Sequence, residues 1–425
     1  MIRRALRFLR ASAGVRASGL LLFGAVAVLA GSYGYNLLCI RWLGPRDYGD
    51  VAALTALTTI VLLPLLGVQA ALAREVSMYR ARGNERAIAA LLRLTLRRTL
   101  VLGGAAALVL VALAPVVTSL LGISRTASTI SAVVLMFVGS FFPLLQAFLQ
   151  GLERFGRIAL ALAIYGFGRP LFAMPILLAG FGVAGAIAAG TVSAFAATLI
   201  VIVALTALLS QGKADAEVRL SDFWPVVFGL FAFTLITNAD VVAAKAFLEE
   251  TEAGTYASAS LVGKVAALIP AGVIAPVLLP RATARIETNQ DAGAIVSASL
   301  LATAIFGLLL TAVAAAVPTS LVTWTFGEQF ADARDLLAPC AGVMTLCGLI
   351  NVNLTFAFAL RDTQLIRLLG LGIVVQLAAF ARLHDSPYEI LAATVIGALV
   401  VIIPHELRSP VAVWRLARAA RGRPL

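Results

Sequence analysis

Charged residues are scarce in this chain. Asp, Glu, Lys and Arg make up only 13% of its 425 residues, whereas 61% are hydrophobic. Soluble domains carry about 25% charged residues, so this balance excludes a water-soluble protein. The apolar residues gather in runs of about 18 or more, each long enough to cross a hydrocarbon core of about 30 Å as a helix. The composition therefore predicts an all-α polytopic membrane protein.

Cysteine and histidine are also rare, at three and two residues. Cys39, Cys340 and Cys347 lie inside apolar runs, where a free cysteine behaves as a small hydrophobe, and neither histidine clusters with them. This pattern argues against a disulfide framework and against a metal site. The chain also lacks a glycine-rich nucleotide loop and an acid pair in a soluble domain of useful size. We therefore expect no catalytic residue, no metal and no organic cofactor.

The chain has few negative charges for its positive ones, with a net charge of +12. The basic residues lie in short flanks between apolar runs and are not interleaved with surface aromatics, which argues against nucleic-acid binding. The basic N-terminus, MIRRALRFLRASAGVR, is followed by a full-length span without a cleavage site of small residues. We interpret it as an interfacial segment before an uncleaved first helix.

Hydropathy predicts about twelve spans. They cover residues 18–40, 50–73, 98–122, 127–152, 156–179, 182–209, 222–248, 258–280, 294–317, 335–360, 363–383 and 387–407. If the N-terminus is inside, 25 of the 33 Lys and Arg residues flank the spans on the inner side and five lie in outer loops. The positive-inside rule then predicts that both termini are cytoplasmic.

The two halves of the chain repeat each other. At a nearly constant offset, Tyr48 recurs as Tyr256 and Pro64 as Pro270. Each half holds six spans, an even number, so we expect two lobes of the same orientation, related by an axis along the membrane normal, with a substrate site between them. The predicted parts are a basic N-terminus (1–17), an N-lobe (18–209), a cytoplasmic linker (210–221), a C-lobe (222–407) and a basic C-terminus (408–425).

Uncharged polar residues inside the spans also match under the repeat. Gln146 matches Asn351, and Asp240, two residues after Asn238, matches Tyr35 beside Asn36. A shared cavity would explain polarity at both places, so we expect Asn36, Gln146, Asn238 and Asn351 to line it. The alternative is that Gln146 and Asn351 merely bond neighbouring helices.

Three charged residues, Asp240, Lys245 and Lys264, lie inside predicted spans of the second half. A charge at the bilayer centre costs about 2.5–3.5 kcal/mol on insertion scales. Asp240 and Lys264 are predicted at similar depth in adjacent helices and could pair, either as a structural ion pair or as a site that couples H⁺ or Na⁺ to alternating access. Lys245 lies near the outer end of its span, and we expect it to reach the interface.

Arg169 lies midway along the span 156–179, in the sequence YGFGRPLFAMP. Arginine stays charged and its fork matches phosphate or carboxylate oxygens, so its position suggests an anionic substrate group. The alternative is an Arg that caps loosened carbonyls or pairs with a distant acid. Pro64, Pro170 and Pro270 interrupt their spans, and we expect bends there that serve gating or only packing.

Three segments carry a resemblance to a known family. They are IRWLGPRDYGDVAALTAL, then EAGTYASASLVGKVAALIPAGVIAPVLLPRAT after an Asp in the seventh span, and WTFGEQFADARDLLAPCAGVMTLCGLINVNLTFAFALRD. The chain resembles Wzx-like flippases of lipid-linked oligosaccharides, within the multidrug/oligosaccharidyl-lipid/polysaccharide exporter superfamily. The resemblance covers almost the whole chain. These patterns are loose and specify the superfamily better than the substrate.

The resemblance implies two six-helix lobes that rock around a cationic cavity, which accepts the diphosphate of a polyprenyl carrier. Arg41, Arg74, Arg169 and Lys264 are the candidate cations, of which only Arg41 and Arg74 lie within the family-like segments. Twelve spans are too few for the two extra helices of some lipid-precursor flippases. The implied partners are membrane lipid, a polyprenyl-diphosphate-linked glycan, and a glycan polymerase or glycosyltransferases, with no nucleic acid.

The sequence thus favours a flippase in the bacterial cytoplasmic (inner) membrane that moves a lipid-linked oligosaccharide outward, driven by an ion gradient. One alternative is a cation-coupled multidrug antiporter on the same fold, which would favour acids and aromatic residues in the cavity. A second alternative is a membrane scaffold for a glycan-synthesis complex, in which cavity residues would not matter for export.

Overall fold

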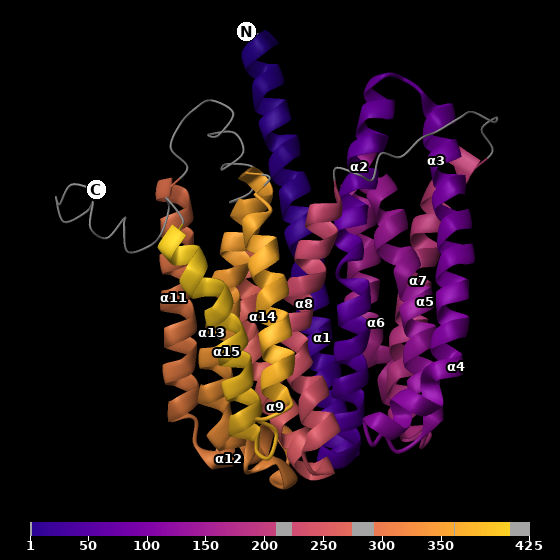
Figure 1. Ribbon diagram of the computed structural model, residues 1–425. Coiled ribbons are helices and arrows are strands. Elements are labelled where there is room, and N and C mark those ends of the chain that lie inside the picture. The colour runs from indigo at the N-terminus through magenta and orange to yellow at the C-terminus, as the bar shows by residue number, and fades with distance from the viewer. Residues whose placement is uncertain (1, 210–222, 274–292, 361, 409–425) are drawn as a thin grey trace, which may run out of the picture. The chain divides into compact units, whose positions relative to one another are not determined.

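A computed structural model describes residues 2–209, 223–273, 293–360 and 362–408, and these residues form helices without any strand. The linker 210–221 and residues 409–425 of the basic C-terminus lie outside the described ranges. The first half of the chain forms seven helices (Figure 1). They are α1 (Ile2–Leu62), α2 (Leu65–Ala81), α3 (Glu85–Arg98), α4 (Gly104–Leu120), α5 (Thr126–Gly151), α6 (Phe155–Leu178) and α7 (Gly182–Leu209), with a π-helical turn (Thr99–Gly103) that joins α3 to α4.

The second half continues with further helices in its described ranges (Figure 1). They are α8 (Trp224–Phe247), α9 (Glu250–Val273), α11 (Gly293–Ala316), α12 (Thr319–Phe326), α13 (Ala333–Leu360), α14 (Gln364–Phe380) and α15 (Pro387–Arg408). A short 3₁₀ turn, Glu328–Phe330, follows α12.

The prediction of about twelve spans is confirmed in the described part of the chain. Nine helices there are long and apolar enough to cross a membrane. The first of them, Gly19–Ala81, is 63 residues long and holds two spans, because Gly44 interrupts it with a φ of 74°, a left-handed conformation that favours glycine. The helices α9 and α14 complete the twelve. The protein is therefore an all-α, multi-pass membrane protein.

The predicted spans and the observed helices differ mainly where polar residues extend a helix beyond the apolar run. The third span was expected from residue 98, but its helix begins at Glu85, where Asn84 caps it by accepting a hydrogen bond from the Ala87 backbone N–H at 3.0 Å. The eighth was expected from residue 258, but α9 begins at Glu250. Hydropathy reports burial in lipid and not helix length, so it misses such polar extensions.

The three prolines expected to bend spans lie in different settings. Pro64 follows a turn at Leu63 and separates α1 from α2. Pro170 lies within α6 and Pro270 within α9, both of which continue as helices past the proline. Only Pro64 therefore coincides with a helix break, as expected for a residue without a backbone N–H.

The chain divides into two compact units, and one stretch of the first half belongs to the second unit. Unit 1 comprises residues 1–42, 65–119 and 123–223, and unit 2 comprises residues 43–64, 120–122 and 224–425. The stretch 43–64 contains the kink at Gly44 at one end and Pro64 at the other. We call residues 43–64 the crossover segment.

Unit 1 is held together by apolar packing around α5. In this unit α5 packs against α2 and α7, and α7 also packs against α6. Large side chains of α5, such as Leu145 and Phe148, are completely buried in this core. The helices α1 and α6 meet at Gly31 and Gly166, where a Cβ on either glycine would overlap the backbone of the other helix. Small residues permit such close approach between membrane helices.

Unit 2 packs α9 against α13, and α13 also against α11, while α8 packs against α14 and α14 against α15. A buried amide joins three of these helices. Gln376 of α14 donates from Nε2 to the Ile236 carbonyl of α8 at 3.1 Å and to Thr394 Oγ1 of α15 at 3.4 Å. The bond satisfies a polar group that is 1% exposed, so the three helices are fixed in register.

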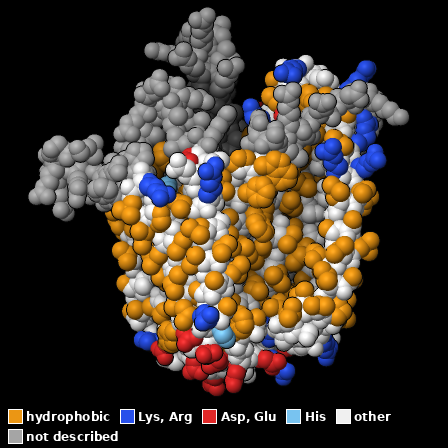
Figure 2. Space-filling view, viewed as in Figure 1, with side chains coloured by type: hydrophobic (Ala, Val, Ile, Leu, Met, Phe, Trp, Pro, Cys, Tyr) orange, Lys and Arg blue, Asp and Glu red, His pale blue; other side chains and the backbone are white. Residues whose placement is uncertain are grey.

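The surface in view has the character expected of a membrane protein. Figure 2 shows hydrophobic side chains covering the middle of the helices, with Lys and Arg most frequent at the upper end, and with Asp and Glu gathered at the lower end, where some Lys and Arg also lie. Exposed apolar residues such as Leu108, Leu308 and Val374 are more than half accessible. Lipid is the environment that makes such exposure favourable.

The glycine contact of unit 1 leads to the first prediction. We expect Gly31→Ala to lower the free energy of unfolding by about 1–3 kcal/mol, because its methyl group has no space against Gly166. The control is Gly34→Ala on the same helix, where nothing lies within 4 Å of the added methyl group. Thermal unfolding of the purified protein, followed by size-exclusion chromatography, measures both. Equal stability of the two variants would contradict the close contact.

Candidate functional site

Arg169 of α6 lies in a stack of aromatic rings in unit 1. Its guanidinium lies 5.0 Å from the ring centroid of Tyr165, and Nη2 donates to the Tyr165 hydroxyl at 3.2 Å. The Tyr165 ring in turn stacks on Phe142 of α5, with centroids 4.8 Å apart and planes 8° apart. The residue numbers differ by four, one helical turn, so the α6 backbone itself places the cation over the ring.

No carboxylate of unit 1 pairs with Arg169 in the described part of the chain. The acidic residues there are Glu75, Glu85 and Glu153, and they lie in or next to the loops at the ends of α2, α3 and α5. The Nε–H of Arg169 is buried and has no hydrogen-bond partner. The expected alternative of a distant acid is therefore not supported within this unit. A cation with unused donors at mid-helix has the chemistry to bind an anionic group.

The other two candidate cations of the first half lie far apart. Arg41 precedes the kink at Gly44, whereas Arg74 lies 30 residues beyond that kink, on α2. At 1.5 Å per residue the two arginines are about 50 Å apart along the helical path, so one diphosphate cannot contact both at once. Arg41 is exposed, and Arg74 is exposed with its guanidinium 5.9 Å from the Phe223 ring centroid.

Two of the four polar residues expected to line a cavity, Asn36 and Asn238, donate hydrogen bonds to backbone carbonyls. In unit 1, Asn36 donates from Nδ2 to the Ser32 carbonyl at 2.8 Å, and Gln146 is half-buried. Tyr35, the repeat equivalent of Asp240, is 4% exposed and donates its hydroxyl to the Ala186 carbonyl at 3.0 Å. In unit 2, Asn351 is half-buried on α13. Their roles as a cavity lining stay predictions.

Asp240 is completely buried in unit 2, where hydroxyl groups of α9 bind it. Its Oδ2 accepts hydrogen bonds from Tyr256 at 3.0 Å and from Ser260 at 3.1 Å. Its Oδ1 is buried and has no hydrogen-bond partner. One oxygen of this carboxylate therefore keeps its capacity to accept a hydrogen bond.

The expected pairing of Asp240 with Lys264 is wrong. Lys264 instead donates from Nζ to Asn238 Oδ1 at 2.9 Å, and Asn238 donates from Nδ2 to the Thr234 carbonyl at 2.8 Å. Asn238 therefore connects Lys264 to α8, a role that sequence depth alone did not reveal. Helix rotation decides which side chains of adjacent spans face each other, and similar depth does not.

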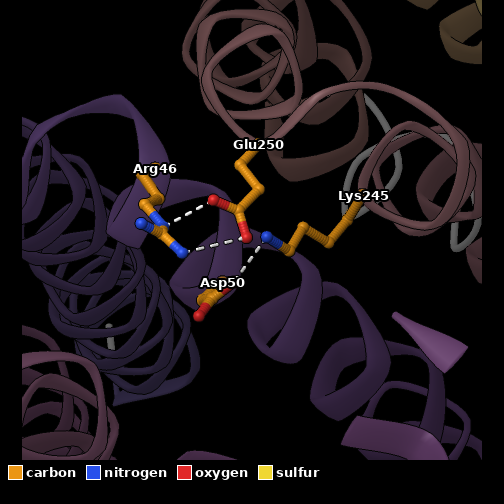
Figure 3. Close-up of polar contacts among 4 residues, drawn as sticks. All are labelled: Arg46, Asp50, Lys245 and Glu250. Atoms are coloured by element: carbon orange, nitrogen blue, oxygen red, sulfur yellow. Dashed lines mark hydrogen bonds and ion pairs between the residues drawn. The ribbon is translucent and has the colours of Figure 1, made fainter. Parts of the chain in front are cut away.

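The expected outward reach of Lys245 is also wrong. The Lys245 side chain is 2% exposed, and its Nζ lies 2.7 Å from Oδ1 of Asp50, whose side chain is fully buried (Figure 3). Asp50 belongs to the crossover segment, 195 residues before its partner. The sequence only hints at this pair. Asp50 lies two residues after Tyr48, which the repeat matches to Tyr256, but the repeat does not indicate that Lys245 is the partner of Asp50.

A second ion pair lies beside the first. Arg46 and Glu250 form two contacts, Nε to Oε2 at 2.5 Å and Nη2 to Oε1 at 3.2 Å (Figure 3). Both side chains are accessible, at 63% and 44%. Arg46 and Asp50 are four residues apart and so lie on one face of their helix. The crossover segment therefore turns a charged face toward α8 and the start of α9.

Backbone packing brings the crossover segment against α9. A Cβ on Gly254 would overlap the carbonyl group of Pro45, and one on Gly49 would lie 3.2 Å from the Gly254 nitrogen. The Tyr48 ring is buried and meets Phe330 edge-on, with centroids 6.3 Å apart. Close backbone contact excludes water, and the ion pair between Asp50 and Lys245 lies buried beside it.

Known proteins agree with this architecture. The sequence model of the family described as "Polysaccharide biosynthesis protein" matches residues 17–285, well over half of the chain. The chain belongs to this family. A comparison with curated proteins finds no match.

Solved structures similar to this family member are transporters of the MOP superfamily. An inward-facing multidrug resistance MATE transporter matches with a TM-score of 0.71 at 16% identity, over 93% of this chain and 98% of its own. The lipid II flippase MurJ, in an inward closed conformation, matches with a TM-score of 0.67 at 10% identity. The match covers 95% of this chain and 87% of MurJ.

A third match is a MOP superfamily transporter from Pyrococcus furiosus, which is described as having a binding pocket of reverse polarity. Its TM-score is 0.60 at 14% identity, and the match covers 97% of this chain and 96% of its own. These low identities establish the shared fold. The resemblance noted in the sequence is thereby confirmed at the level of the family.

The two ion pairs predict different costs of truncation. We expect Lys245→Met to lower the free energy of unfolding by about 3–5 kcal/mol, because it removes the ammonium group that lies 2.7 Å from the buried Asp50 carboxylate. The comparison variant, Arg46→Ala, breaks an accessible pair and should cost less than about 1 kcal/mol. Thermal unfolding in detergent measures both. Similar losses of unfolding free energy in the two variants would show that the buried pair contributes no more to stability than the accessible pair.

Proposed function

We propose that this member of the polysaccharide biosynthesis family is a flippase that moves a polyprenyl-diphosphate-linked oligosaccharide outward across the bacterial cytoplasmic membrane. The observation that carries the proposal is Arg169, a mid-helix cation of unit 1 with a buried, unused Nε–H and no carboxylate partner in the described part of that unit. A diphosphate supplies the oxygens that such a guanidinium lacks.

The aromatic rings next to Arg169 suit the rest of this substrate. Tyr165 and Phe142 are half-buried and buried, and their stacked rings fix the guanidinium in place. Fixed donors lose little conformational entropy when an anion binds, so the stack favours binding. Lys264 supplies a cation in unit 2, where Asn238 holds its Nζ.

Transport outward requires that the chain lie with both termini in the cytoplasm. The excess of Lys and Arg at one end of the helices supports that orientation (Figure 2). In this orientation Arg74 lies toward the cytoplasmic end and Arg41 toward the outer end, so the separated cations would contact a diphosphate in turn. MurJ, a lipid II flippase, shares the fold.

A cation-coupled multidrug antiporter is the second candidate, and Asp240 favours it. This buried acid has a free Oδ1, and MATE transporters share the fold. Cationic drugs, however, require an acid that is accessible to them, whereas Asp240 is 0% exposed and hydrogen-bonded by Tyr256 and Ser260. Asp240 is better suited to couple H⁺ or Na⁺ to transport than to bind a drug.

The role of Arg169 can be tested by transport. In proteoliposomes with a fluorescent polyprenyl-diphosphate sugar, Arg169→Ala should slow translocation by about tenfold to a hundredfold, since hydrogen bonds to charged groups are lost. Arg169→Lys should recover only part of the rate, because Lys lacks the fork. The control, Arg125→Ala, removes an exposed cation of the same unit and should leave the rate unchanged. A normal rate for Arg169→Ala would refute the proposed role.

The role of Asp240 is tested by gradients. Asp240→Asn keeps an oxygen that can accept from Tyr256 and Ser260 but removes the titratable charge. We expect transport by this variant to lose its response to an imposed pH or sodium gradient, while size-exclusion chromatography shows a folded protein. A retained gradient response would contradict coupling at Asp240, and aggregation would show that the group is structural.

A further inference from the structure

The buried pair Asp50–Lys245 joins two parts of unit 2 that are far apart in the sequence. Asp50 lies on the crossover segment, which packs in unit 2 although residues 1–42 before it and α2 after it belong to unit 1. The segment is bounded by the left-handed Gly44 and by the break at Pro64. Hinges at both ends allow a short helix to leave its neighbours without unfolding.

The contacts of the crossover segment differ in what it costs to break them. The Arg46–Glu250 pair is accessible, so water replaces each partner at little cost. The Asp50–Lys245 pair is buried, so its separation takes two charges apart out of water. The buried pair is therefore the costlier of the two ion pairs to break.

An anion can supply the missing partner for Lys245. A phosphate group presents the same oxygens to an ammonium group as the Asp50 carboxylate does, with more negative charge. We propose that Asp50 and Lys245 form an exchangeable latch: an anionic phosphate group of the transported molecule replaces Asp50 at Lys245 and so releases the crossover segment. This inference rests on the proposed function for its substrate class and assigns Lys245 as a further substrate-binding residue.

The exchange gives the two partners opposite effects on binding. Asp50 competes with the ligand for Lys245, so Asp50→Asn should tighten binding of inorganic diphosphate by about tenfold. Lys245 binds the ligand, so Lys245→Met should weaken it by a similar factor. A merely structural pair would make both variants weaker or leave both unchanged. The protein for the test is the full chain in lipid nanodiscs, with affinity measured by calorimetry.

Matched controls come from an exposed ion pair of the same unit, Arg334 and Asp335. Asp335→Asn removes one negative charge and Arg334→Ala one positive charge, as the two test variants do. Neither control should change diphosphate affinity by more than about twofold, because exposed charges are screened by solvent. Equal effects of the test variants and the controls would show a net-charge effect and would overturn the exchange.

Release of the crossover segment is measured separately, by cysteine labelling. Ala53 is 0% exposed and lies on the same helical face as Arg46 and Asp50, at spacings of seven and three residues. In a chain whose three native cysteines are replaced by alanine, Ala53→Cys should react with a water-soluble maleimide several-fold faster when diphosphate is added. With Asp50→Asn, the faster labelling should occur without diphosphate. A cysteine at Ala161, buried in unit 1, should stay unreactive in both cases.

The outcomes separate this inference from the proposed function. If diphosphate binds and Arg169→Ala weakens it, but Asp50→Asn and Lys245→Met shift affinity in the same direction, the exchange is wrong and the flippase proposal stands. If diphosphate does not bind the wild-type chain, both are wrong. If Asp50→Asn is unstable, the swapped variant Asp50→Lys/Lys245→Asp retains a pair, and it should fold but bind diphosphate with altered affinity; unaltered affinity would also overturn the exchange.

Discussion

A charge buried among membrane helices has to find its partner inside the protein, and this constraint organises the polar interior of this chain. Asp50 and Lys245 satisfy each other, Asp240 accepts from two hydroxyl groups, and Lys264 donates to an amide. Two of the buried charged groups keep an atom without a hydrogen-bond partner. Asp240 keeps one free oxygen, whereas Arg169 keeps a free N–H, so a cation suits the first and an anion the second.

The crossover segment carries one partner of the buried ion pair. It packs in unit 2, and the chain continues into unit 1 at both of its ends. Its backbone is in close contact with α9 through Gly49 and Gly254, which excludes water and raises the cost of separating the buried pair. Gly44 and Pro64 limit the change to two points of the backbone. The same few residues therefore both close the contact and define how it can open.

Much of the fold could be predicted from the sequence, and the candidate site only in part. Apolar runs separated by basic flanks predict the number and class of the helices, because spanning a bilayer fixes helix length and composition. They also single out Asp240, Lys245 and Arg169 as residues that need an explanation. The predicted pairing of Asp240 with Lys264 and the predicted outward reach of Lys245 were both wrong, because depth along a helix does not specify the direction in which a side chain points.

The sequence by itself determined that this chain is a membrane protein of about twelve spans in the polysaccharide biosynthesis family, since hydropathy and segment patterns are local properties. The tertiary structure alone decided that Lys245 meets Asp50 across 195 residues, and that Asp240 is held by Tyr256 and Ser260. The physical reason is that an ion pair depends on helix rotation and on contacts between distant segments. No local pattern carries that information.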